Sequence, residues 1–337
     1  MNPHSSPHGE LVSAAFRPHP LLTNPHLQTI VPSKLRPTPQ LYLRRERCEL
    51  PDGDFLDLAW SGPDSAVRAI LLHGLGGGFD SKYARGTALA LHAEGIGTVQ
   101  MQFRGAGGEP NRLDRSYHSG DTHDLGWLVA ELQRRHPGVV WLAIGWSLGG
   151  NVLLKYLGEQ GADCALIGAA AVSVPFELQR GAERMSRGLS RLYQNHLLRE
   201  LKAGLRRKFA GRKPAINLQQ ALQADDFFAF DDAATAPLNG FENARDYYAR
   251  CSSRPFLQAI QRPTLIIHAA DDPFMTPTVV PKAEELAPGV RLELAAHGGH
   301  VGFVSADRWG QPQLWLERRL PAYARELASN TGLHNDP

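Results

Sequence analysis

The sequence predicts an α/β fold in which helices flank a mostly parallel central sheet and one helical insertion interrupts the pattern. Short, nearly continuous apolar runs are typical of strands buried on both faces of a parallel sheet. Such strands are expected at residues 68–74, 97–105, 138–147, 164–175, 264–271 and 291–296. Helices are expected between several of them, at 81–95, 121–135 and 149–160. Strands that alternate with helices form parallel sheets with right-handed connections.

The other segments complete the predicted organisation. Residues 1–38 are rich in Pro and His without sustained periodicity, so we expect an extended or loosely ordered N-terminal lead-in, whose one apolar stretch, Phe16–Ile30, is a candidate to dock on the body. Two alternating runs, joined by a turn that contains Asp-Gly, predict a β-hairpin at the start of the first core segment, 39–175. Residues 176–263 contain no convincing strand and predict a helical lid, after which 264–337 completes the core. Asp121, three residues before Asp124, predicts an acidic N-cap for the helix at 121–135.

Composition excludes several classes of protein. The chain has 337 residues, with 36 Lys and Arg against 34 Asp and Glu, a formal net charge of +2. This balance argues against a nucleic-acid-binding protein. The three cysteines, Cys48, Cys164 and Cys251, lie far apart, which excludes a disulfide framework and a structural zinc site. Because the N-terminal residues show neither a signal peptide nor a long apolar run, we expect a cytoplasmic protein without a membrane span.

The strongest chemical signal is the pentapeptide GxSxG at 145–149, between a predicted strand and a predicted helix. This context is typical of a nucleophile elbow, in which small residues let a serine occupy a strained turn. An isolated serine hydroxyl is a poor nucleophile, so Ser147 requires a base and an acid that orients the base. The alternative interpretation is a glycine-rich turn with an incidental serine.

Candidate acids and bases follow two later strands: Asp271 and Asp272 after one, His297 and His300 after the next. We choose Asp272 because it lies further into its loop and precedes Pro273, whose fixed φ helps to define the turn. We choose His300 because the two glycines before it let the loop turn the imidazole towards the serine. The chain order serine, aspartate, histidine is the one that α/β-hydrolase folds use.

Two backbone N–H groups are expected to form an oxyanion hole. One belongs to Leu148, which follows the serine, and the other to Leu75 in the glycine-rich loop 73–78. This loop satisfies neither phosphate-binding pattern, because position 79 is Phe and no Lys-Ser or Lys-Thr follows at the required spacing. A dinucleotide-binding oxidoreductase is therefore excluded. The expected chemistry requires no metal or organic cofactor.

Further segments extend the pattern over most of the chain: 24–30, 73–77, 103–105, 117–120 with Asp124, 230–232, 237–241, 246–248, 271–274 and 298–303. Together with the elbow they resemble the α/β-hydrolase superfamily, and within it the YheT-like hydrolases, which are similar to animal abhydrolase-domain proteins 1 and 3 and to a plant embryogenesis-associated protein. The resemblance implies a serine hydrolase of carboxylic esters, of short-chain carboxylesterase or acylglycerol lipase type, linked to lipid metabolism. It carries Ser147, Asp272 and His300 over as the triad.

Two other functions remain compatible with the pattern. An acyltransferase would use the same triad but exclude water in favour of an alcohol or thiol acceptor. A non-catalytic interaction protein on this scaffold would need no triad. Outside the triad, the matched Arg104 and Asp124 are interpreted as an ion pair that braces the oxyanion loop, with direct contact to substrate as the alternative.

A basic segment lies within the predicted lid. Residues 180–213 contain eleven Lys or Arg and two acidic residues, a local net charge of +9, with leucines and aromatic residues between them. One interpretation is a solvated helix whose apolar face packs on the core. The other is a basic amphipathic surface that makes peripheral contact with anionic lipid or meets an acidic acyl substrate.

Overall fold

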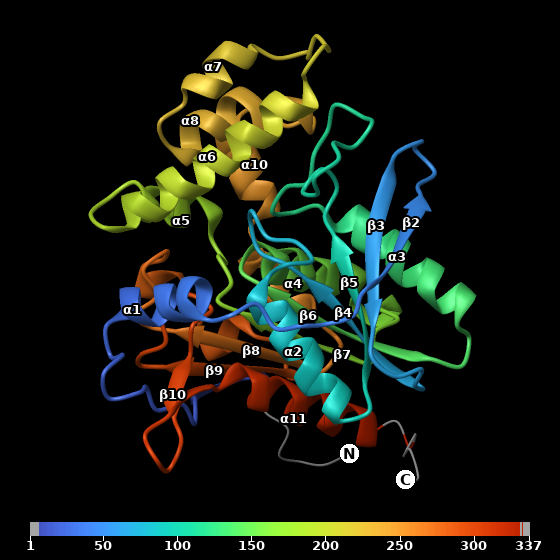
Figure 1. The fold of residues 1–337 in the computed structure, drawn as a ribbon, viewed down its shortest axis with the longest axis vertical. Helices are drawn as coiled ribbons and strands as arrows, with labels where there is room; N and C mark the ends of the chain where they lie inside the picture. The colour runs from blue at the N-terminus through green and yellow to red at the C-terminus, as the bar shows by residue number, and fades with distance from the viewer. Residues whose placement is uncertain (1–6, 331, 333–337) are drawn as a thin grey trace.

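The computed structural model describes residues 7–330 and residue 332, and a nine-stranded sheet forms its centre. The strands lie in the order β1-β9-β8-β7-β6-β4-β5-β3-β2 (Figure 1). Neighbouring strands are parallel except at β2–β3 and β3–β5, where the predicted hairpin enters the sheet. All six predicted parallel strands are present. The bounds are β1 Glu10–Ser13, β2 Arg44–Glu49, β3 Phe55–Ser61, β4 Val67–Leu72, β5 Gly97–Gln102, β6 Val140–Trp146, β7 Gly168–Val172, β8 Thr264–Ala269 and β9 Val290–Ala295.

Helices cover both faces of the sheet, and alternate side chains of each central strand point into two apolar layers. In β4, Ile70 and Leu72 pack in one layer with residues of α3 and α4. Ala69 and Leu71 pack in the opposite layer with residues of α2 and α11. Burial on both faces is why these strands appear in the sequence as continuous apolar runs. The flanking helices are α2 (Lys82–Ala93), α3 (Thr122–Arg135), α4 (Leu148–Gln160) and α11 (Leu316–Ser329).

The residues between β7 and β8 form helices, and within them the structure contains no strand, as the break in the pattern predicts. In Figure 1, α5 to α8 and α10 of this helical insertion (residues 176–263) stand at the top, apart from the helices that flank the sheet. The insertion has an apolar cluster of its own, in which Leu198 and Leu205 of α6 pack with Phe209 and Phe230. Its elements are α5 (Leu178–Met185), α6 (Ser190–Lys208), α7 (Leu218–Gln223), α8 (Phe227–Phe230), η3 (Asp231–Thr235), α9 (Ala236–Leu238), α10 (Ala244–Cys251) and η4 (Arg254–Ala259).

The N-terminal segment, of which residues 1–6 lie outside the described part of the chain, differs from the extended or loosely ordered lead-in predicted up to residue 38, although Phe16 is buried in the core as the expected docking predicts. Glu10–Ser13 form β1, which pairs in parallel with β9 at the edge of the sheet. Pro25–Ile30 form helix α1, with Asn24 as its N-cap, and Val31–Leu35 continue it as the π-helical turn η1. The prediction is wrong here because elements of four to six residues carry too little periodicity to detect, and tertiary packing decides whether they form.

Asp121 occupies the N-cap position of α3, but its side chain makes no capping hydrogen bond. Both of its carboxylate oxygens instead accept hydrogen bonds from Arg115 Nη2, each at 2.8 Å. The prediction is therefore right about the N-cap position of Asp121 and wrong about its capping hydrogen bond. A hydrogen bond from a charged guanidinium to a carboxylate is stronger than one from a neutral backbone N–H.

The remaining elements are short. A small hairpin, β10 (Val304–Ala306) and β11 (Pro312–Leu314), precedes α11, and the 3₁₀ turns are η2 (Gly161–Asp163), η5 (Pro277–Val279) and η6 (Ala283–Glu285). The three cysteines are buried and unpaired. None of the helices in the described residues is both long and apolar enough to cross a membrane.

Candidate active site

Ser147 lies in a sharp turn between β6 and α4, with φ 51° and ψ −118°. Residues with side chains rarely adopt a positive φ, and such strain persists only where the surroundings fix it. The flanking glycines are required for close packing. A Cβ atom at Gly145 would lie 2.5 Å from the carbonyl oxygen of Gly149, and one at Gly149 would lie 2.4 Å from that of Leu72. The turn therefore presents the serine hydroxyl at the carboxyl end of β6.

His300 links Ser147 to Asp272. Its Nε2 lies 3.0 Å from Ser147 Oγ, and its Nδ1 lies 2.8 Å from Asp272 Oδ2. The other carboxylate oxygen of Asp272 accepts a hydrogen bond from the N–H of Phe274 at 2.8 Å, and Asp272 is only 4% exposed. The structure thus brings together the three side chains selected from the sequence, from loops that follow β6, β8 and β9. Their catalytic roles stay predictions.

The two alternatives, Asp271 and His297, form a separate pair. Asp271 Oδ2 lies 3.2 Å from His297 Nδ1, and Asp271 Oδ1 accepts a hydrogen bond from the N–H of Gly299 at 3.0 Å. The imidazole of His297 is half exposed to solvent. This pair shapes the loop that carries His300 but makes no hydrogen bond to the serine.

Phe274 stacks on the imidazole of His300, with ring centroids 3.9 Å apart and planes at 9°. Tyr193 of α6 packs against Phe274, and its hydroxyl lies 3.0 Å from Nδ1 of His26 in α1. The stack restricts rotation of the imidazole and covers one of its faces. This role is not predictable from the local sequence, because a ring stack depends on tertiary distance. The one available signal was the position of Phe274 in the matched segment 271–274.

Leu75 and Leu148, whose N–H groups are the predicted oxyanion donors, line the same cavity as Ser147. Leu148 is the first residue of α4, so its N–H has no partner within the helix. Leu75 lies in the glycine-rich loop 73–78, and its N–H makes no hydrogen bond to any described residue. These are the two donors that the sequence selects for an oxyanion hole, and that role stays a prediction.

The loop that carries Leu75 is anchored on both sides of that residue. The N–H of Gly74 donates to the hydroxyl of Tyr83 at 2.8 Å, and the N–H of Gly76 donates to that of Tyr117 at 3.2 Å. These bonds fix the plane of the intervening peptide units, so the Leu75 N–H keeps one direction.

His73 fixes the start of the same loop. Its Nε2 accepts a hydrogen bond from the N–H of Phe103 at 3.2 Å, so its Nδ1 carries the proton and donates to the carbonyl of Gly74 at 2.7 Å. Burial lowers the pKa of His73 to about 4, which keeps the imidazole neutral near pH 7. This histidine has a structural role in the loop.

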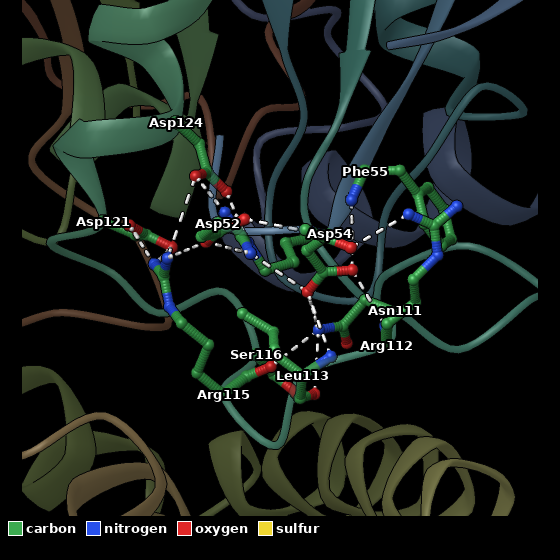
Figure 2. Close-up of polar contacts among 12 residues, drawn as sticks. Asp52, Asp54, Phe55, Asn111, Arg112, Leu113, Arg115, Ser116, Asp121 and Asp124 are labelled. Atoms are coloured by element: carbon green, nitrogen blue, oxygen red, sulfur yellow. Dashed lines mark hydrogen bonds and ion pairs between the residues drawn. The ribbon is translucent and has the colours of Figure 1, made fainter. Parts of the chain in front are cut away.

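A buried cluster of charges holds the loop 103–121, to which Tyr117 belongs. Arg104 donates to both carboxylate oxygens of Asp124, at 2.9 and 2.6 Å, and also to Asp52 and Asp54, at 2.8 and 3.0 Å. Figure 2 shows these three carboxylates gathered together. The predicted ion pair of Arg104 with Asp124 is therefore formed, and it reaches the glycine-rich loop 73–78 through Tyr117.

The helical insertion contributes Lys208 to the edge of this cluster. Its Nζ donates to Asn111 Oδ1, to the carbonyl of Arg115 and to Ser116 Oγ, at 2.6, 2.5 and 2.9 Å. Asn111 in turn donates to Asp54 Oδ2 at 2.6 Å (Figure 2). Burial lowers the pKa of Lys208 to about 7. The carboxyl end of α6 is thus tied to the core through a buried amine.

Ser147 opens into a cavity of about 980 Å³ between the sheet and the helical insertion. This volume accommodates a drug-sized or lipid-sized molecule. Residues 7–330 provide no group of three His, Cys, Asp or Glu side chains able to hold a metal ion. The insertion lines the cavity mainly with apolar and aromatic side chains, which include Met185, Leu197, Leu201, Phe227 and Tyr247.

Comparison with known proteins gives the family. Residues 70–307 match the family model described as alpha/beta hydrolase fold. The chain is 46% identical over 316 residues to YheT of Escherichia coli (strain K12), which is named as a candidate esterase, and the match covers 92% of each chain. It is 28% identical over 314 residues to Phospholipase ABHD3 of Mus musculus, covering 90% of this chain and 76% of that protein.

A solved structure agrees with this assignment at the level of the fold. The Pyrococcus furiosus esterase Pf2001 superposes with a TM-score of 0.55 at 16% identity, covering 86% of this chain and 93% of that one. The resemblance to YheT-like hydrolases is therefore confirmed, and the chain belongs to the α/β-hydrolase fold family.

Proposed function

We propose that this protein is a serine hydrolase that cleaves carboxylic esters through an acyl-enzyme intermediate. Ser147 is the nucleophile, His300 the general base and Asp272 the residue that orients it. The observation that carries the proposal is the continuous line of hydrogen bonds from Asp272 through His300 to Ser147, at 2.8 and 3.0 Å. The names of two relatives, a candidate esterase and a phospholipase, support ester substrates.

The first half of the reaction forms the acyl-enzyme. Nε2 of His300 takes the proton of Ser147 Oγ as that oxygen attacks the ester carbonyl carbon. Asp272 keeps the proton on Nδ1 and stabilises the imidazolium that forms. The N–H groups of Leu75 and Leu148 donate to the oxyanion of the tetrahedral intermediate. His300 then donates its proton to the leaving alcohol, the ester bond breaks, and the acyl group remains on Ser147.

The second half releases the acid. His300 takes a proton from a water molecule, whose oxygen attacks the acyl carbon, and it returns that proton to Ser147 Oγ as the acyl bond breaks. The named side chains, the ester and one water molecule supply every proton and electron pair. The proposed reaction therefore uses no metal or organic cofactor.

The helical insertion acts as a lid in this proposal and shapes the acyl site. Leu197 and Leu201 of α6, together with Phe227, offer apolar surface on the insertion side of the cavity. Because these side chains lie across the cavity from the sheet, the acyl chain of a small-molecule or lipid ester would pack between the insertion and the core.

Labelling and hydrolysis test the proposal together. A fluorophosphonate probe should label wild-type protein but not Ser147→Ala, and wild type should hydrolyse p-nitrophenyl butyrate. Product analysis with and without an added alcohol separates hydrolysis from acyl transfer. Folded wild-type protein that neither binds the probe nor turns over esters would overturn the serine mechanism.

We also propose that α6 and the turn before it meet anionic lipid at the protein surface. Leu189 and Leu192 are 62% and 66% exposed, and Arg187 and Arg191 beside them are exposed and have no ion-pair partner among the described residues. Apolar side chains flanked by free positive charge suit a negatively charged lipid surface. Tyr193 and Leu197 on the same helix line the cavity, so contact here would bring lipid close to the site.

Vesicle binding tests this contact. Wild type should bind phosphatidylglycerol vesicles at least about tenfold more tightly than phosphatidylcholine vesicles, and the double variant Arg187→Glu/Arg191→Glu should lose most of that preference. The matched control is Arg17→Glu/Arg308→Glu, which reverses two exposed arginines elsewhere. Binding that depends on neither anionic lipid nor salt would refute the contact.

A further inference from the structure

The loop that carries His300 has a backbone that needs support from outside. Gly298, Gly299, Val301 and Phe303 have positive φ values of 154°, 60°, 60° and 48°. Val301 and Phe303 bear side chains, for which this region is disfavoured, so surrounding contacts must maintain the conformation. The position of the imidazole of His300 depends on those contacts.

Thr29 of α1 holds the backbone of His300 itself. Its Oγ1 accepts a hydrogen bond from the N–H of His300 at 2.9 Å. The single hydroxyl proton of Thr29 is used elsewhere, because Oγ1 donates to the carbonyl of Pro25 at 2.8 Å. That bond fixes the rotation of the hydroxyl, so a lone pair of Oγ1 faces the N–H of His300. Thr29 is itself 7% exposed.

Gln28 holds the end of the same loop. Its side chain is fully buried, with 0% exposure. Oε1 accepts a hydrogen bond from the N–H of Val304 at 2.7 Å, and Nε2 donates to the carbonyl of Val304 at 2.9 Å. A second donation from Nε2, to the carbonyl of Leu22 at 2.6 Å, ties the amide to its own segment. One side chain thus bonds both backbone groups of Val304, the first residue of β10, as a neighbouring strand would.

The loop and α1 are also in direct backbone contact. A Cβ atom at Gly299 would lie 2.4 Å from the carbonyl oxygen of Pro25, and one at Gly302 would lie 2.1 Å from that of Gln28. No side chain fits between the two segments, so a shift of α1 moves the loop with it. On the core side, the loop backbone is also bonded by the N–H of Val301, which donates to Oγ of the buried Ser173 at 3.0 Å, and by the N–H of Gly299, which donates to Asp271.

We propose that Thr29 and Gln28 are positioning residues for His300, a role that rests on the proposed function of His300 as general base. The imidazole must reach Ser147 Oγ and Asp272 at the same time, and a misplacement of about 1 Å can lower the rate about 100-fold. The hydrogen bond from the N–H of His300 to Oγ1 of Thr29 sets the distance between the histidine loop and Ser147. The segment 24–30, which has no catalytic atoms of its own, is therefore part of the apparatus that aligns the base.

Substitutions at Thr29 test this role. Thr29→Val replaces the accepting oxygen with a methyl group of similar size, and Thr29→Ser keeps the oxygen. The experiment measures kcat and KM for p-nitrophenyl butyrate. The thermal unfolding transition of each variant gives the fraction of folded protein, to which kcat is normalised. Thr29→Val should lower kcat about 10- to 100-fold with KM within about twofold, and Thr29→Ser should retain at least about a third of wild-type kcat. Thr38→Val, in the same N-terminal segment without a side-chain hydrogen bond, is the control and should match wild type.

The outcomes separate the two proposals. If wild type and Ser147→Ala are equally inactive, the proposed function fails and positioning is not at issue. If wild type is active and Thr29→Val keeps kcat within twofold, the positioning role is wrong. It is equally wrong if Thr29→Ser falls as far as Thr29→Val, since packing of the methyl group would then explain the loss. Should Thr29→Val not fold, Thr29→Ala, which leaves space instead of filling it, replaces it in the same comparison.

Discussion

Ser147 and His300, the proposed nucleophile and base, are held in place by different kinds of structure. Ser147 lies in a turn whose flanking glycines pack closely on backbone, Gly145 against Gly149 within the turn and Gly149 against Leu72 at the end of β4. His300 is fixed by distant residues. Its hydrogen-bond partners lie 28 positions away at Asp272 and 271 positions away at Thr29.

Because of this difference, substitutions that disturb the turn of Ser147 should differ from those that disturb the loop of His300. The strain at Ser147 is built into a pentapeptide that joins a strand to a helix, so substitutions there act locally. The position of His300 depends on several segments that meet only in the folded chain. A substitution in α1 can therefore displace His300 while the amino-acid sequence of its own loop stays the same.

The largest expected effect is on activity and comes from substitution of Ser147 itself. Ser147→Ala should lower kcat for p-nitrophenyl butyrate by roughly 10⁶-fold, because the other triad members cannot act without the nucleophile. The free energy of unfolding should stay within about 1 kcal/mol of wild type, since only a hydroxyl is removed. A variant that kept a tenth of wild-type activity would show that another residue is the nucleophile.

The next effect distinguishes Asp272, which contacts His300, from its neighbour Asp271. Asp272→Asn should lower kcat by about 10⁴-fold, because an amide at this position favours the wrong tautomer of His300. Asp271→Asn preserves the volume of a carboxylate that bonds His297 and the loop backbone, and it should cost less than about tenfold. Steady-state kinetics on both variants checks the assignment. A larger loss at position 271 would reverse it.

A glycine substitution tests the strain of the elbow. Gly149→Ala would place a Cβ atom 2.4 Å from the backbone oxygen of Leu72, which cannot move aside as a flexible side chain could. We expect a loss of about 1–3 kcal/mol in the free energy of unfolding, measured by urea denaturation, together with lower kcat. Gly138→Ala is the control, because a Cβ atom there meets nothing within 4 Å. Equal stability of the two variants would contradict the close packing.

The last expected effect concerns the attachment of the insertion. The pKa of Lys208 is lowered by burial to about 7, whereas an unfolded lysine titrates near about 10.4. Between these values the unfolded chain binds more protons than the folded one, so stability rises with pH. The free energy of unfolding of wild type relative to Lys208→Met should increase from pH 7 to pH 10, by at most about 1.4 kcal/mol per pH unit.

Denaturation at several pH values measures this slope. The same substitution at the exposed Lys34 provides the control and should leave the pH dependence unchanged. A difference between wild type and Lys208→Met that falls or stays flat above pH 7 would contradict the buried amine that ties α6 to the core.

The parts of the fold and site that could be predicted are those with local signals. Strands such as β4 are buried on both faces, so their apolar runs are continuous. The serine stands out because its turn requires small residues on both sides. Asp272 and His300 could be chosen because Pro273 and two glycines mark loops that leave the sheet.

The errors have a common cause in tertiary contacts. Asp121 was expected to cap α3, but Arg115 takes its carboxylate. The stack of Phe274 on His300 joins residues 26 positions apart, a relation without any periodic pattern. Helix α1 is too short to leave a periodic signal, although the structure makes it the support of the histidine loop.

The sequence by itself determined the α/β class, the strand-to-helix turn of Ser147 and the choice of its two partners, because each follows from short-range sterics and periodicity. Only the tertiary structure decided which segments hold His300, how Lys208 ties the insertion to the core, and what lines the cavity. These depend on distances between residues far apart in the chain, and a backbone N–H such as that of His300 does not reveal its partner until the chain has folded around it.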